Sequence, residues 1–99
     1  MTAKSFRLVT IICEPVLSSA ILGLIKSQGA SGFTVTDVLG EGSGEKSSGA
    51  VPEQKIKIEI IADASLAHQL VSKIADTYFE NYSIIVYSSE ISILRPNKF

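Results

Sequence analysis

The sequence has few of the residues from which metal centres and disulfide frameworks are built. It contains one cysteine, Cys13, one histidine, His68, and no tryptophan among its 99 residues. One cysteine excludes an intramolecular disulfide and a thiolate-ligated iron–sulfur cluster, and one histidine leaves too few ligands for an ordinary zinc site. We therefore expect no bound metal, and a chain suited to a reducing cytoplasm.

An excess of charge of one sign is also lacking. Nine lysines and arginines stand against ten acidic residues, which gives a net charge of −1 and an isoelectric point near 5.7. This balance creates no long-range attraction for a polyanion, so nucleic acid is not an expected partner. No apolar run approaches the roughly 18 residues of a membrane span, and the first residues lack the order of a signal peptide. We expect a cytoplasmic protein that binds small molecules and other proteins.

The sequence does have a regular series of apolar segments. Hydrophobic residues make up 45% of the chain, enough for one core, and we expect residues 1–99 to form a single domain. Residues 5–13 and 32–39 predict two strands. Residues 55–61 predict a third strand, in which apolar and charged residues alternate: Ile56, Ile58 and Ile60 on one face, and Lys55, Lys57 and Glu59 on the other.

Two further segments have the apolar spacing of helices. After Pro15, which suits a first helical turn, apolar residues recur to Ile25, and Gly29 can end the helix. Asp63 can cap a second helix, whose apolar stripe reaches Tyr78, and Asn81 can end it. Both helices therefore have a signal at each end.

The resulting order is strand, helix, strand, strand, helix, strand, with the last strand expected from about residue 83. Residues 90–94 either continue this last strand or form a separate edge strand after it. This order is typical of a ferredoxin-like βαββαβ sandwich, an α+β fold in which both helices cover one face of an antiparallel sheet. We predict that Val9, Ile11 and Ile61 are apolar on the uncovered face, which favours a homo-oligomer.

A long polar segment, residues 40–54, separates the second and third strands. Long loops in small domains are usually functional. Gly40, Gly42 and Gly44 would let backbone N–H groups point at a phosphate, and Ser43 could add a hydroxyl. Lys46 is the one cation of the segment and two glutamates balance it, which favours a ligand with fewer phosphates than a triphosphate. The alternative is a solvated hairpin extension without a ligand.

Two parts of the sequence resemble a known family. The segment GFTVTDVLGEG at residues 32–42, followed by KIKIEII at residues 55–61, resembles the strand, loop base and return strand of PII signalling proteins. YFENYSIIVYSSEISIL at residues 78–94 and the shortened loop GSGEKSSG are similar to the PII-like proteins associated with bicarbonate transporters and carboxysome operons. The resemblance covers nearly the whole chain.

The resemblance implies a homotrimer that binds an adenine nucleotide between neighbouring subunits. The residues 40–54 would be its T-loop, a flexible segment that docks on a partner. AMP or ADP is the favoured ligand, with cyclic AMP and ATP as alternatives and bicarbonate as a second ligand; no covalent cofactor is implied. The implied partner is a bicarbonate or other membrane transporter, which would recruit the protein to the inner face of the membrane. The implied nucleotide-binding residues are Thr34, Gly40, Gly42, Ser43, Lys46, Glu59 and Arg95.

The sequence departs from the PII pattern between the second helix and the last strand. Classical PII proteins have a glycine- and lysine-containing phosphate loop there, whereas Glu80, Asn81 and Tyr82 make this connection short and acidic. The departure disfavours ATP with magnesium. The T-loop also has no tyrosine for covalent modification, the chain lacks the paired terminal cysteines of some relatives, and Gly44 stands where relatives often have an arginine.

Catalysis is not expected, because no nucleophile has a convincing base beside it. An acylphosphatase-type hydrolase on the same fold would need an arginine-bearing anion loop after the first strand, and residues 13–17 contain no cation. An RNA-binding sheet would have aromatic residues on its central strands, and RLVTII and KIKIEII have none. Without the resemblance, the preference of threonine for strands would account for Thr34 at its position, and charge pairing across strands would account for Glu59.

Overall fold

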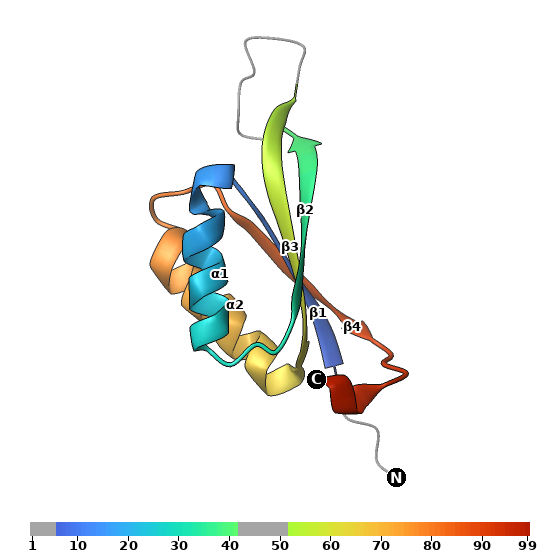
Figure 1. Cartoon of the computed structure of the whole chain (residues 1–99). Helices are drawn as coiled ribbons and strands as arrows, with labels where there is room; N and C mark the ends of the chain where they lie inside the picture. Colours follow the sequence, from blue (N-terminus) through green and yellow to red (C-terminus); the bar gives the residue numbers. More distant parts are fainter. Residues whose placement is uncertain (1–5, 42–51) are drawn as a thin grey trace.

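The computed structural model describes residues 6–41 and 52–99. Within these ranges, the main elements follow one another as β1 (Phe6–Cys13), α1 (Ser18–Ser27), β2 (Phe33–Gly40), β3 (Glu53–Asp63), α2 (Ala64–Tyr78) and β4 (Ile85–Ile91). Two short 3₁₀ turns, η1 (Pro15–Leu17) and η2 (Pro96–Lys98), precede α1 and follow β4. Both helices lie on the same side of the sheet (Figure 1). The predicted ferredoxin-like α+β fold is confirmed.

The strands form an antiparallel sheet in the order β2-β3-β1-β4. At one end of the sheet, Gly40 pairs with Glu53, and we call this the hairpin end. At the other end, Phe6 pairs with Asp63 and Ile91, and we call this the Phe6 end. Strands β2 and β4 are the two edges, so β1 and β3 have neighbours on both sides.

The predicted start of α2 and the predicted end of α1 are confirmed, whereas α1 begins at Ser18 after the 3₁₀ turn at Pro15, and α2 ends at Tyr78, before Asn81. The Asp63 carboxylate accepts a 2.8 Å hydrogen bond from the Leu66 amide and so caps α2. At the end of α1, Gly29 has φ of 98°, a left-handed conformation that favours glycine. The amide of Ala30 then donates to the Ile25 carbonyl at 3.1 Å, which satisfies a carbonyl of the last helical turn.

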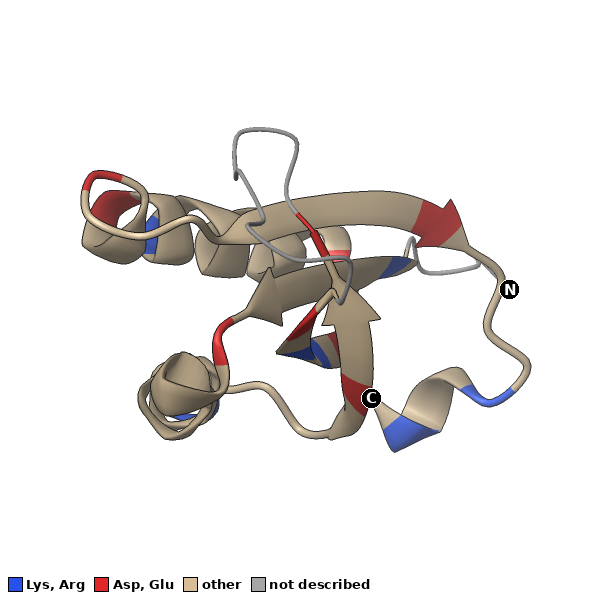
Figure 2. Ribbon diagram, turned by 90° about the horizontal axis from the view of Figure 1, so that it is seen from above, with Lys and Arg blue, Asp and Glu red and all other residues tan. Residues whose placement is uncertain are grey.

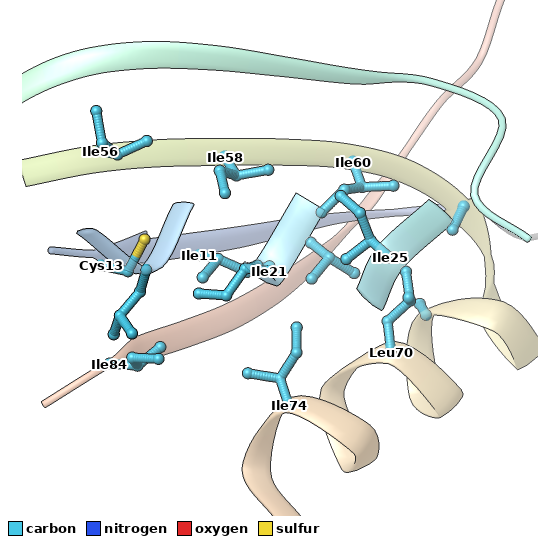
Figure 3. Close-up of a cluster of buried hydrophobic side chains, with 14 residues drawn as sticks. Ile11, Cys13, Ile21, Ile25, Ile56, Ile58, Ile60, Leu70, Ile74 and Ile84 are labelled. Atoms are coloured by element: carbon cyan, nitrogen blue, oxygen red, sulfur yellow. The ribbon is translucent and has the colours of Figure 1, made fainter. Parts of the chain in front are cut away.

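The core lies between the two helices and one face of the sheet. Figure 3 shows side chains from β1, β3, α1 and α2 pointing toward one another in this layer. Branched aliphatic residues dominate it because they fill a flat space between a helix and a pleated surface. The fully buried members are Val9, Ile11, Cys13, Ile21, Ile25, Ile58, Ile60, Leu70 and Ile74.

The prediction for the uncovered face was wrong at two of three positions. Val9 and Ile11 are 0% exposed and belong to the core, whereas Ile61 lies on the uncovered side as predicted. Strand β1 is apolar on both faces, so its periodicity could not show which face the helices cover. The strand register decides the face of Val9 and Ile11. Val9 pairs with Ile60 and Ile11 pairs with Ile58, and both isoleucines of β3 are core residues.

The uncovered side of the sheet, which we call the open face, is nevertheless apolar. Alternation along β1 places Phe6, Leu8, Thr10 and Ile12 on it, together with their partners on the neighbouring strands. Its apolar members are Phe6, Leu8, Ile12, Val38, Ile61, Ile85, Tyr87 and Ile91. Ile85 and Tyr87 are 49% and 52% exposed. The predicted consequence, a surface that favours self-association, therefore rests on a different set of residues.

The two hairpin strands reach farther toward the loop than the sequence predicted, and β3 is also longer than predicted. Gly40, Glu53 and Gln54 were expected in the loop but belong to β2 and β3. The pairs Leu39–Gln54 and Gly40–Glu53 continue the antiparallel ladder, whose hydrogen bonds outweigh the low strand propensity of these residue types. The rest of the predicted loop, residues 42–51, lies outside the described residues.

Charged positions of both signs are interspersed around the described part of the fold (Figure 2). The near-zero net charge likewise gives no long-range attraction for a polyanion. None of the helices in residues 6–41 and 52–99 is long and apolar enough to cross a bilayer.

Candidate functional site

A buried lysine lies at the hairpin end of the sheet. Lys55 is 6% exposed and is the one charged residue in the buried class among residues 6–41 and 52–99. Its Nζ lies 3.7 Å from Oε2 of Glu53, whose side chain is 70% exposed. The Lys55 stem lies beside Gly40, where a Cβ atom would stand 3.8 Å from Lys55 Cγ. The hairpin end therefore carries a positive charge beside Gly40.

The sequence interpretation missed Lys55 as a candidate ligand. Alternation placed it among the solvated residues of β3, like Lys57 and Glu59, which are half-buried. The signal available in the sequence was its position, because it follows a glycine-rich loop within three residues of Pro52. A buried ammonium is costly unless an anion compensates it, and the Glu53 carboxylate lies within ion-pair distance of Lys55.

Thr34 and Glu59 form a second group, on the open face. They are direct partners across β2 and β3, and Glu59 also pairs with Thr10 on β1. Thr10 in turn pairs with Tyr87 on β4, so a polar row crosses the whole sheet. The direct cross-strand partners of Glu59 are thus two hydroxyls rather than two cations. This arrangement does not support charge pairing across strands as the reason for a glutamate here.

Arg95 lies at the Phe6 end, in the segment that follows β4. It is exposed and immediately precedes η2. The segment folds back against the sheet, because the Phe99 ring contacts the Phe6 ring edge-on at a centroid distance of 6.3 Å. The guanidinium of Arg95 is therefore carried at the end of the sheet opposite to Gly40 and Lys55.

The predicted site residues do not meet at one place within the chain. Thr34 and Gly40 are six residues apart on one strand, which corresponds to about 20 Å at the rise of a β-strand. Gly42, Ser43 and Lys46 lie outside the described residues. The described ones divide into a hairpin-end group, Gly40 joined by Lys55, and a Phe6-end group, Thr34, Glu59 and Arg95. Their roles in binding remain predictions.

Cys13 also lies near the hairpin end, and its thiol should be unreactive in the folded protein. It is 1% exposed. Burial and the neighbouring Glu14 carboxylate raise the pKa of the Cys13 thiol, and the Lys55 ammonium offsets them only in part. Since the thiolate is the reactive form, a disulfide reagent such as DTNB should modify Cys13 slowly at pH 8 and rapidly once the protein is unfolded in guanidinium chloride.

The comparison of the two modification rates checks this prediction directly. Rapid modification of the folded protein at pH 8, at a rate close to that of the unfolded chain, would contradict it. The raised pKa also fixes the direction of the pH effect on stability. The unfolded chain loses its thiol proton first, so the contribution of Cys13 is present below the unfolded pKa and is lost as the pH rises above it.

The chain matches known proteins over almost its entire length. The family model for nitrogen regulatory protein P-II matches residues 6–98. A PII-like signalling protein from Thermus thermophilus has 30% identity and a TM-score of 0.81, with 100% of this chain and 99% of that one covered. CPII from Thiomonas intermedia K12, solved with ADP, AMP and acetate, has 26% identity and a TM-score of 0.74, with 100% and 98% covered.

A further structure of CPII from Thiomonas intermedia K12 was solved with ADP and bicarbonate. It has 23% identity to this chain and a TM-score of 0.82, and the alignment covers 99% of this chain and 97% of that one. At this identity the similarity concerns the fold. The ferredoxin-like arrangement of four strands and two helices is therefore shared along the full length of both chains.

Proposed function

The chain belongs to the nitrogen regulatory protein P-II family, and from this premise we propose that it is a PII-like regulatory protein that binds an adenine nucleotide at the interfaces of a homotrimer. In this proposal the 99 residues act as one domain. Nucleotide binding changes the conformations available to the T-loop and so changes the affinity for a partner protein. The protein carries out no chemical step of its own.

The observation that carries the proposal is the separation of the predicted nucleotide residues into two groups. Gly40 and Lys55 lie at the hairpin end, while Thr34, Glu59 and Arg95 lie toward the Phe6 end. Thr34 and Gly40 are about 20 Å apart along β2, and Arg95 follows β4 at the Phe6 end, so one chain does not gather all the predicted residues at one place. In the proposed trimer, the hairpin end of one subunit adjoins the Phe6-end group of the next, and one nucleotide contacts both.

The open face supplies the surface for such an assembly. Eight apolar side chains lie on it, and Ile85 and Tyr87 are half-exposed in the single chain. Three copies that turn these faces toward a common axis would bury them together, as heterologous contacts do in a closed ring. Each interface of the ring would then bring together two different ends of neighbouring sheets, which is the arrangement that the divided site requires.

The charges at the hairpin end favour AMP or ADP over ATP. Lys55 is the buried cation there, and it already contacts Glu53. The connection between α2 and β4 adds no cation among residues 79–84, so a triphosphate would be weakly compensated. CPII, whose solved structures hold ADP, AMP and bicarbonate, supports the same choice for this chain, with bicarbonate as a second ligand beside the nucleotide.

The partner in this proposal is a membrane transporter for bicarbonate or another solute. Binding through residues 42–51, the central part of the T-loop, would bring the trimer to the inner face of the membrane from the cytoplasm. The hydrolase alternative has no support among the described residues: Glu14 and the turn Pro15–Leu17 after β1 supply no cation for an anion loop.

Calorimetric titration with AMP, ADP, ATP and cyclic AMP, each with and without bicarbonate, tests the function. We expect AMP or ADP to bind at micromolar concentration and ATP with magnesium to bind more weakly. Lys55→Met, which keeps the length of the buried stem, should weaken phosphate-bearing ligands at least tenfold, since hydrogen bonds to charged groups contribute about 1.5–3 kcal/mol. Failure of all four nucleotides to bind would rule out the proposal.

Complementation between two defective variants tests the divided site. Lys55→Met alters the hairpin-end group and Glu59→Arg alters the Phe6-end group, so each homotrimer should bind nucleotide poorly. Each mixed trimer contains one interface in which both groups are intact, and random mixing at equal amounts should restore roughly one quarter of the wild-type sites. If the mixture binds no more nucleotide than the separate variants, the two groups do not share an intersubunit site.

A further inference from the structure

A pocket of about 300 Å³ lies on the helix-covered side of the sheet, near the Phe6 end. One wall comes from β1 and β4 and carries two polar side chains, Arg7 and Ser88; the other wall comes from the first half of α2. The residues that line it are Arg7, Ala64, Ala67, His68, Val71 and Ser88. Its size is at the lower end of the range for small-molecule sites in proteins.

The two walls differ in chemistry. The guanidinium of Arg7, the imidazole of His68 and the hydroxyl of Ser88 are all able to donate hydrogen bonds. The remaining lining is apolar, and comes from two alanines and Val71 on consecutive turns of α2. Two hydrogen-bonding groups from the strands and one from α2, together with a short apolar surface on α2, fit a small molecule with an anionic head and a few carbon atoms.

The ion pair of Arg7 leaves its guanidinium accessible to a second carboxylate. Nη2 of Arg7 lies 3.6 Å from Oε1 of Glu90, and the Glu90 side chain is 78% exposed. A charge-assisted hydrogen bond is shorter, about 2.7–2.9 Å, and exposed ion pairs contribute little to stability. Glu90 can therefore rotate into water when a carboxylate in the pocket forms the paired hydrogen bonds that a guanidinium favours.

The pocket is separate from the proposed nucleotide site. Arg7 and Ser88 belong to the helix-covered face of β1 and β4, since Arg7 pairs with Glu90 and Ser88 pairs with the core residue Val9. Thr34 and Glu59 lie on the open face, and Lys55 lies at the hairpin end. A ligand in this pocket would therefore occupy the opposite side of the sheet from the Thr34–Glu59 row.

We infer that this pocket binds a small aliphatic monocarboxylate, with its carboxylate on Arg7, His68 and Ser88 and its carbon chain against α2. A single negative charge suits the site better than two, because Glu90 remains at the rim. The inference does not depend on the nucleotide proposal, since it uses none of the residues assigned to that site.

Titration of the full-length protein with sodium butyrate, followed by ¹H–¹⁵N NMR spectra, tests the inference. We expect saturable shifts of the amide signals of Arg7, Ala67, Val71 and Ser88. Butyramide has the same shape without the charge and should produce no saturable shift. Inorganic phosphate, which lacks the carbon chain and carries more charge at neutral pH, should bind more weakly than butyrate.

Variants on the two walls sharpen the test. Arg7→Gln should weaken butyrate binding at least tenfold, in line with the loss of a charge-assisted hydrogen bond, and Val71→Phe should fill the pocket and also weaken binding. Glu90→Gln should strengthen binding by a few fold, because it removes the competing carboxylate, which a general loss of structure would not do. Nucleotide affinity should be unchanged in Arg7→Gln.

Four results would overturn the inference: no saturable butyrate shift at millimolar concentration, equal binding of butyramide, phosphate binding as tight as that of butyrate, or undiminished butyrate binding in Arg7→Gln. Each can occur while AMP or ADP still binds at micromolar concentration. The outcome for this pocket is therefore distinguishable from the outcome for the nucleotide site.

Discussion

Ile58→Ala is expected to lower the free energy of unfolding by about 2–5 kcal/mol, the range for removing a large aliphatic side chain from a closed core. Ile58 is 0% exposed. It lies at the middle of β3, pairs with Ile11 on β1 and points into the layer that α1 and α2 cover (Figure 3). Strands on both sides hold the backbone in place, so the cavity cannot readily collapse.

Val35→Ala is the matched control for this experiment. Val35 is the partner of Ile58 on β2 and lies on the same side of the sheet, but it is 43% exposed at the edge. Its replacement should cost well under half as much. Urea denaturation of both variants at the same protomer concentration measures the difference, since assembly makes apparent stability depend on concentration. Equal losses for the two variants would contradict the core that we describe.

The sequence was sufficient to predict the order of elements, the start of α2 and the end of α1. Asp63 and Gly29 carry local signals, a capping carboxylate and a left-handed glycine, that depend on a few neighbouring residues and do not require knowledge of the tertiary structure. The alternation in β3 was equally clear, because Ile56, Ile58 and Ile60 are buried and the residues between them are charged. Local chemistry and the fold agree at these positions.

The assignment of faces failed where the sequence lacked such contrast. In β1 both faces are apolar, so Val9 and Leu8 are equivalent by periodicity. Only the pairing with β3 and β4 shows that Val9 enters the core and Leu8 lies on the open face. Register is set by contacts between segments far apart in the chain, so it cannot be predicted from the sequence of one strand with two apolar faces.

The candidate site was only partly predictable, because its arrangement also depends on the strand register. The resemblance to PII proteins suggested Thr34, Gly40, Glu59 and Arg95 as single positions, yet their division between two ends of the sheet follows only from the register. Lys55 was missed because alternation predicts which face a side chain occupies and not how deeply it is buried. Burial of a charge becomes visible when the surrounding strands are in place.

A charge introduced at the centre of the proposed trimer interface should separate the subunits. Ile85 lies on the open face, paired with Ile12, and is 49% exposed in the single chain. If this face is buried on assembly, Ile85→Glu places an uncompensated charge in each of three equivalent contacts, at a cost of several kcal/mol per ion. We expect monomers in sedimentation velocity at micromolar concentration, together with loss of nucleotide binding.

The loss of binding follows because the two halves of the site lie on different subunits, so a folded monomer would still lack one half. Ile85→Arg should give the same result, since burial and not the sign of the charge causes dissociation. Val16→Glu is the matched control: Val16 is 81% exposed in the turn before α1, and its trimer should remain intact. A trimeric Ile85→Glu protein that binds ADP normally would show that the open face is not the interface, and the divided site would then need another explanation.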